Sequence, residues 1–119
     1  MKFHPNELVL IYDPRSEIGK KTFATAKTLS NHINAIDILN TEITTTIWKE
    51  VLFLLKLQPK EIMNRSSVYY DDHIRGHEIT MQGLLDILTH SPEIVVGPIA
   101  IKGKKAILCK TPTDVLKVT

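Results

Sequence analysis

Apolar residues in the first third of the chain follow two spacings, which predict a strand, a helix and a second strand. An apolar run at Glu7–Tyr12 stops at Asp13, and Ile33–Leu39 alternates apolar and polar residues, as strands do. Between them, Ser16 can act as the N-cap of a helix that we expect to end near Asn31. This order favours a right-handed parallel crossover between the two strands.

The middle of the chain is predicted to be mostly helical. Apolar residues in Ile47–Leu55 recur near helical spacing, and a proline at the first helical position favours a short helix over Pro59–Asn64. Thr80 can cap a further helix, which we expect to end before Ser91. The polar stretch Ser66–Gly76 is expected to be a connection without helix or strand.

The last part of the chain predicts a β-hairpin followed by a short helix. Two apolar segments, Pro98–Ile101 and Ala106–Cys109, flank a lysine-rich turn centred on Gly103. Thr111 and Pro112 then supply a cap and a first-position proline for a terminal helix. Together these elements predict an α/β fold with a mixed sheet flanked by helices.

Composition indicates an ordinary globular protein. Of the 119 residues, 43% are hydrophobic and 24% are charged, far from the composition of disordered chains. The length fits a single domain, which we expect to span residues 1–119. The formal net charge of +2 gives no electrostatic reason to expect nucleic acid as a partner.

The compartment is predicted from two features that the sequence lacks. Its apolar runs fall far short of the ~20 residues that a membrane span requires, so we expect no membrane partner. Met1–Glu7 has no apolar stretch of the kind found in secretory signals, and the single cysteine cannot form an internal disulfide. We therefore expect a cytoplasmic protein.

Three segments carry a resemblance to a known family. His90–Ile101 is similar to a His-Pro-x-Leu-Ile-x-Arg-Pro-Ile-Val-Val motif, and Lys104–Val118 continues the match. Ile11–Ser16 is similar to an Ile-Tyr-x-x-Pro-Arg-Cys loop with one residue fewer, and Leu57–Arg65 resembles the middle segment. The chain thus resembles the thioredoxin-like arsenate reductase and Spx family over nearly its whole length.

The resemblance implies a fold and a set of activities. The fold would be a thioredoxin-like mixed four-stranded sheet flanked by helices, with a helical insertion between the second and third strands. Pro98 would be the cis-proline beside the active-site loop. The family implies arsenate reduction linked to glutathione and glutaredoxin, or Spx-type transcriptional regulation through an RNA polymerase subunit.

The chain departs from the family at the positions that carry its chemistry. The nucleophilic cysteine falls at Ser16, and the arginine before the cis-proline is Gly97. An arginine after the last-strand cysteine becomes Lys110. By resemblance, an anion- or thiol-binding site would comprise these three residues together with two retained arginines and the proline, namely Arg15, Ser16, Arg65, Gly97, Pro98 and Lys110.

Ser16 has three interpretations, of which helix capping is the simplest. A nucleophilic serine needs a positioned base, and no Ser-His-Asp spacing is recognisable. A helix N-terminus can also bind an anion, with charge added by Arg15, Arg65 and Lys110.

Cys109 lies in an apolar strand and is expected to be a buried packing residue. Without a second cysteine, an Spx-type Cys-x-x-Cys switch is excluded.

Three further groups have a structural interpretation that we favour over a functional one. The first is a ligand-rich stretch, which we expect to be a solvated loop without metal. The second is a set of hairpin lysines, which protect an exposed strand edge. The third is an aromatic and apolar set on the second helix, expected in the core. The ligand-rich stretch comprises Asp71, Asp72, His73, His77 and Glu78. The hairpin lysines are Lys102, Lys104 and Lys105, and the set on the second helix is Trp48, Phe53 and Leu54.

The sequence therefore predicts a degenerate relative of the reductases, a pseudoenzyme. The leading function is a non-catalytic module that binds an anion or a protein and requires no cofactor. One alternative is an oxidoreductase of the arsenate reductase class that uses glutathione and glutaredoxin. A further alternative is an Spx-like transcriptional regulator.

Overall fold

A four-stranded mixed sheet organises the computed structural model, which describes residues 6–119. The strand order is β2-β1-β3-β4. β1 pairs with β2 in parallel and with β3 in antiparallel orientation, and β3 and β4 form the predicted hairpin. The bounds are Leu8–Tyr12 for β1, Ile33–Asp37 for β2, Ile99–Lys102 for β3 and Lys105–Leu108 for β4. The predicted mixed sheet, with its parallel pair, is confirmed.

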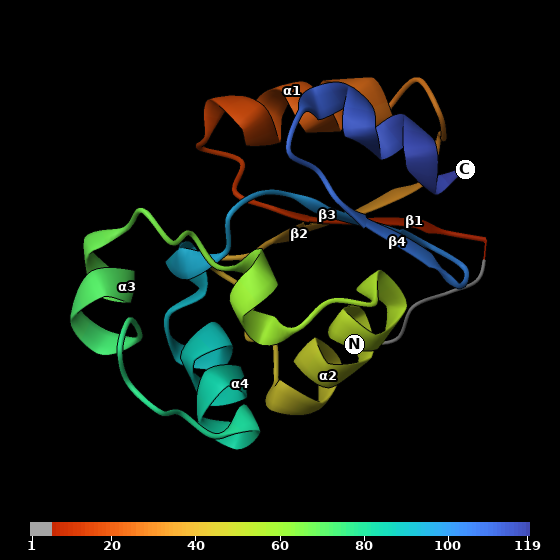
Figure 1. Ribbon diagram of the computed structural model, residues 1–119. Coiled ribbons are helices and arrows are strands. Elements are labelled where there is room, and N and C mark those ends of the chain that lie inside the picture. Colours follow the sequence, from red (N-terminus) through yellow and green to blue (C-terminus); the bar gives the residue numbers. More distant parts are fainter. Residues whose placement is uncertain (1–5) are drawn as a thin grey trace.

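Helices cover both faces of this sheet (Figure 1). One face carries α1 (Glu17–Ala26) and the C-terminal 3-10 helix η3 (Pro112–Val118). The other side holds the segment inserted between β2 and β3, with α2 and α4 adjacent to each other. Its elements are α2 (Thr45–Leu55), η1 (Pro59–Ile62), α3 (Val68–His73), α4 (Met81–His90) and η2 (Pro92–Ile94). The expected helical insertion is therefore present.

The central strand β1 supplies both hydrophobic cores. Successive side chains of a strand point to opposite faces, so Leu8 and Leu10 enter the core beneath α1 and η3. Val9 and Ile11 enter the larger core against the inserted helices. All four are completely buried. This double burial explains why β1 reads as a continuous apolar run.

The helices begin where side-chain oxygens replace missing backbone acceptors. Ser16, Thr44, Ser67 and Thr80 each accept a hydrogen bond from the N–H group three residues later, at the starts of α1, α2, α3 and α4. The predicted caps at Ser16 and Thr80 are confirmed. Such caps each stabilise a helix by about 1 kcal/mol.

Two predictions of secondary structure are wrong: the end of the first helix, and the absence of helix from residues 66–76. α1 ends at Ala26 instead of near Asn31, because the chain tightens there into i to i+3 hydrogen bonds, such as that from the Leu29 N–H to the Ala26 carbonyl. The stretch expected to be a polar connection contains α3, because Tyr70 and Ile74, one turn apart, both bury their side chains.

Phe53 also corrects the sequence interpretation, because its side chain is 80% exposed instead of lying in the core. α2 turns the face that carries Trp48, Val51 and Leu52 into the larger core. Successive helical residues are rotated by about 100° from each other, so Phe53 is turned away from that face. Trp48 is completely buried, as expected, and Leu54 packs partly against the core.

No helix within residues 6–119 has the length and apolar composition needed to cross a membrane. Residues 1–5, which carry most of the segment considered for a secretory signal, lie outside the described residues.

A substitution that creates a cavity in the larger core should destabilise the whole fold. Leu88 is completely buried on α4, so Leu88→Ala should lower the free energy of unfolding by about 2–5 kcal/mol. Gln82→Ala, at an exposed position of the same helix, should change it by no more than about 0.5 kcal/mol. Urea unfolding followed by circular dichroism measures both. Equal effects of the two substitutions would contradict the assigned core.

Candidate functional site

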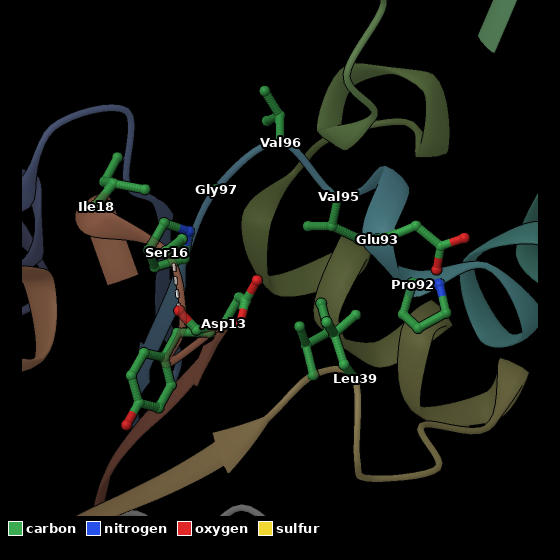
Figure 2. A pocket seen from close by; sticks show the side chains of 12 residues that line it. Asp13, Ser16, Ile18, Leu39, Pro92, Glu93, Val95, Val96 and Gly97 are labelled. Carbon is green, nitrogen blue, oxygen red and sulfur yellow. Dashed lines mark hydrogen bonds between the residues drawn. The ribbon is translucent and has the colours of Figure 1, made fainter. Parts of the chain in front are cut away.

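A cavity of about 140 Å³ lies where the parallel strands β1 and β2 end. One wall is the β1–α1 connection with the first turn of α1, and the opposite wall is the segment from Pro92 to Pro98 (Figure 2). Ile38 and Leu39, directly after β2, complete it. In α/β sheets, the carboxyl ends of parallel strands are the usual place for a ligand site. The cavity is therefore the candidate functional site.

Ser16 lines this cavity, and its hydroxyl both donates and accepts a hydrogen bond within the β1–α1 segment. Its Oγ–H donates to the Asp13 carbonyl and its Oγ accepts from the Gly19 N–H, both at 2.9 Å. A Cβ at position 19 would collide with the Asp13 carbonyl oxygen, so only glycine allows α1 to start this close to the loop. Among the described residues lining the cavity there is no histidine that could act as base. The capping interpretation of Ser16 is confirmed.

The guanidinium of Arg15 is committed to two carboxylates. Nη1 and Nη2 donate to the two oxygens of Asp37 at 3.0 and 2.5 Å, and Nε contacts Asp13 at 2.9 Å. The bidentate hydrogen bond from Arg15, assisted by those from Asn40 and the Leu39 N–H, lowers the pKa of Asp37 to about 2. One positive charge thus faces two negative charges, and this group carries no surplus positive charge for an anion.

Gly97 and Pro98 also line the cavity, in the segment that leads into β3. A Cβ at position 97 would lie 2.6 Å from the Cys109 carbonyl oxygen, so the close approach of these two backbones excludes a side chain there. The expectation that Pro98 is a cis-proline is wrong, since no cis peptide bond occurs among residues 6–119. The trans isomer is the lower-energy state of an X-Pro bond, and the Pro98 carbonyl here accepts from the Cys109 N–H at 2.7 Å.

Arg65 and Lys110 are not among the residues that line the cavity. Arg65 is exposed in the connection between η1 and α3, where its carbonyl accepts from the Arg75 side chain. The backbone N–H of Lys110 donates to Asp114, and the residue lines a separate hollow beside β4. Of the six residues suggested by resemblance, the structure brings Ser16, Gly97 and Pro98 to the cavity, with Arg15 held beside them.

Cys109, the single cysteine of the sequence, is completely buried in the core beneath η3. Burial, with a smaller contribution from Asp114, raises the pKa of its thiol to about 12. The thiolate is the reactive form of cysteine, so this thiol is unreactive at neutral pH. The expected packing role is confirmed.

The cavity also contains residues that the sequence did not single out. Leu39, Val95 and Ile38 make it partly apolar, and Glu93 adds a second carboxylate to that of Asp13. No lysine or arginine is found among the described residues that line it. In the structure this surface is recognisable because Leu39, a large apolar residue, is 41% exposed. No local sequence pattern predicts that exposure.

The acidic and histidine residues of 71–78 and the hairpin lysines were the remaining candidate groups. Over residues 6–119, no three histidine, cysteine, aspartate or glutamate side chains converge as metal ligands do. Asp71 pairs with Arg75 on the surface, and His73 stacks on Tyr69. The strand β4, which carries Lys105, is an edge strand, as the edge-protection interpretation requires.

Comparisons with known proteins identify the fold. No family model matches the sequence, and no curated protein matches it. An arsenate reductase structure from Vibrio cholerae superposes with a TM-score of 0.88 at 18% identity, covering 98% of this chain and 100% of that one. A candidate arsenate reductase from Yersinia pestis gives a TM-score of 0.87 at 20% identity, covering 93% and 99%. At such identities the likeness concerns architecture, and the chain therefore has the thioredoxin-like fold of the arsenate reductase structures.

Proposed function

We propose that this chain is a non-catalytic thioredoxin-fold module whose cavity beside Ser16 receives an apolar side chain of a protein partner. The observation that carries the proposal is the commitment of Arg15 to Asp13 and Asp37 beside a cavity that is partly apolar and otherwise acidic. A reused scaffold of this kind keeps the fold while the site changes its chemistry.

The charges at the cavity disfavour an oxyanion such as arsenate. The N-terminus of α1 favours negative charge, but the cavity lining already contains two acidic residues. Asp13 precedes α1, and Glu93 lies on the opposite wall. Arg15 is neutralised by its own carboxylate partners. An incoming oxyanion would therefore meet unbalanced negative charge. The carboxylates of glutathione would meet the same charges.

The nucleophiles also disfavour thiol chemistry. Reduction by the family's route needs a thiolate that attacks arsenic and is later released by thiol exchange. Cys109 is buried with a pKa raised to about 12, and Ser16 cannot form a disulfide. The glutathione- and glutaredoxin-linked oxidoreductase thus has no supporting observation in the site.

The size of the cavity favours a single side chain as its occupant. Its volume is about 140 Å³, whereas cofactor and drug-sized ligands occupy about 300–1,000 Å³. Leu39 and Val96 are partly exposed at its rim, where they can contact a polypeptide that crosses it. A neutral or basic peptide with one aliphatic side chain matches both the shape and the charge.

A peptide library should select ligands that depend on Leu39. We expect displayed peptides with an aliphatic anchor to bind the wild type, and Leu39→Ser to weaken them roughly tenfold or more, because it removes the contact that buries the anchor. Leu116→Ser is the matched control, since Leu116 has 43% exposure against 41% for Leu39 and lies outside the cavity. Isothermal titration calorimetry measures the affinities. Purified glutaredoxin and an RNA polymerase subunit can be tested in the same format. Absence of any Leu39-dependent ligand would overturn the proposal.

The titration of Asp37 should report the commitment of Arg15. In the wild type the carboxyl should titrate near pH 2, and Arg15→Met should raise its pKa towards the ordinary value of 3.8. Because the folded pKa is lowered, the stabilisation from this pair is complete above about pH 4 and is lost as pH falls through about 2. Carboxyl NMR measures both, with Asp114, whose pKa of about 2 arises from the Thr111 N–H and Lys117, as an internal control that should not move. An unchanged Asp37 in the variant would mean that Arg15 is free to bind anions.

Arsenate-dependent thiol oxidation should be absent from both the wild type and Ser16→Cys, assayed with glutathione and glutaredoxin present. The variant restores a thiol at the N-terminus of α1, so iodoacetamide should modify it while Cys109 stays protected by burial. Circular dichroism confirms that both proteins are folded. Activity in the wild type would overturn the non-catalytic assignment. Activity in Ser16→Cys alone would show a functional oxyanion site and overturn the assignment to an apolar side chain.

A further inference from the structure

A second hollow lies on the helical side of the molecule, between α2 and α4. Its volume is about 460 Å³, and it shares no lining residue with the cavity beside Ser16. The two helices that border it pack next to each other below the sheet (Figure 1). Phe53 of α2 and Met81 of α4 line it and are both exposed, while Leu52, Leu57 and Leu85 form deeper parts. We call this hollow the Phe53 groove.

The apolar surface of the Phe53 groove is not required by the core of the protein. α2 already buries Trp48, Val51 and Leu52, whereas the ring of Phe53 is 80% exposed. A single exposed apolar side chain is common on protein surfaces. Here two of them border one concave surface, and an apolar groove of this kind is typical of a protein interaction site.

The charges bordering the groove all have the same sign. Lys49 lies one helical turn before Phe53, and Lys56 follows at the end of α2. Within the described residues, the lining includes these two lysines and no carboxylate. Glu50 and Glu61 lie nearby in sequence but outside the lining, and Glu61 accepts from the Gln58 N–H. The groove thus combines an apolar floor with positive flanks.

Lys56 occupies a position where glycine would be more favourable. It has a φ of 59° and is the only non-glycine residue with positive φ among residues 6–119. The left-handed conformation after a helix is usually adopted by glycine, because a Cβ is disfavoured there. The lysine therefore lowers the stability of the α2 terminus while adding a positive charge beside Phe53.

We propose that the Phe53 groove binds an acidic amphipathic helix of a partner protein. Apolar side chains from one face of that helix lie against Phe53, Met81 and Leu85, in the manner of a helix in a groove. Its flanking aspartate or glutamate side chains pair with Lys49 and Lys56. A second copy of the chain is the less favourable occupant, because a two-fold dimer through this patch brings the same lysines towards each other.

The test uses two synthetic helical peptides with identical leucine anchors. One carries glutamate at the flanking positions and the other carries lysine. We expect the glutamate peptide to bind the wild type, to bind more weakly as salt concentration rises, and to bind at least roughly tenfold more tightly than the lysine peptide. Fluorescence anisotropy measures affinity, and NMR shift changes should cluster on α2 and α4. Equal binding of the two peptides, or no binding of either, would overturn the proposal.

Matched variants separate the groove from general surface effects. Phe53→Ala should weaken the glutamate peptide roughly tenfold or more, whereas Val68→Ala, at a position 74% exposed on α3, should leave its affinity unchanged. Lys56→Gly should weaken the peptide but raise the urea midpoint, because glycine relieves the left-handed position. A loss of binding with Val68→Ala, or retention with Phe53→Ala, would contradict the assigned surface.

The oligomeric state of the wild type shows whether the Phe53 groove is covered by a second copy of this chain. We expect a monomer by analytical ultracentrifugation, with or without Phe53→Ala. A dimer that Phe53→Ala dissociates would show that the groove is covered by another copy of this chain and would overturn the proposal. This result is independent of the peptide library test, which concerns the cavity beside Ser16.

Discussion

The burial of β1 on both faces is the constraint on which the rest of this structure depends. Its apolar side chains point alternately up and down, so neither face of the sheet can remain in water. α1 and η3 must cover one face, and the inserted helices must cover the other. Because β1 is central and its C-terminal end opens into the β1–α1 loop, the same constraint brings Ser16 and Arg15 to the edge where β2 also ends.

At that edge, short-range polar contacts determine what the site can bind. The Ser16 hydroxyl caps α1, and Arg15 joins the β1–α1 loop to the end of β2 through Asp37. These interactions use the groups that would otherwise serve a nucleophile or an anion. What remains accessible is a small cavity with aliphatic side chains and the carboxylates of Asp13 and Glu93. The same thioredoxin-like architecture is thus compatible with chemistry unlike that of a thiol enzyme.

The two candidate binding surfaces have opposite electrostatic character. The cavity beside Ser16 is bordered by carboxylates, whereas the Phe53 groove is bordered by lysines. A near-neutral chain, with a formal net charge of +2, therefore carries two local fields of opposite sign. The two proposals therefore call for ligands of opposite charge, a neutral or basic peptide at the cavity and an acidic helix at the groove.

The sequence by itself determined the elements whose signals are local. The apolar run of β1, the hairpin turn at Gly103 and the caps Ser16 and Thr80 depend on residues close in the chain, and each was predictable. The thioredoxin-like sheet followed from the order of these elements together with the family resemblance. The burial of Cys109, directly after β4, followed from the apolar run Ala106–Leu108 that precedes it in the sequence.

Only the tertiary structure decided the partners of residues distant in sequence. Arg15 and Asp37 are separated by a helix, and their pairing arises because parallel strands bring their carboxyl ends together. The segment around α3 is helical because Tyr70 and Ile74, at its C-cap, have a core to pack against. Phe53 is exposed because α2 turns a different face into that core. Local patterns specify which segments can be helix or strand, but long-range packing decides which side chains meet, because contact between elements depends on their arrangement in space.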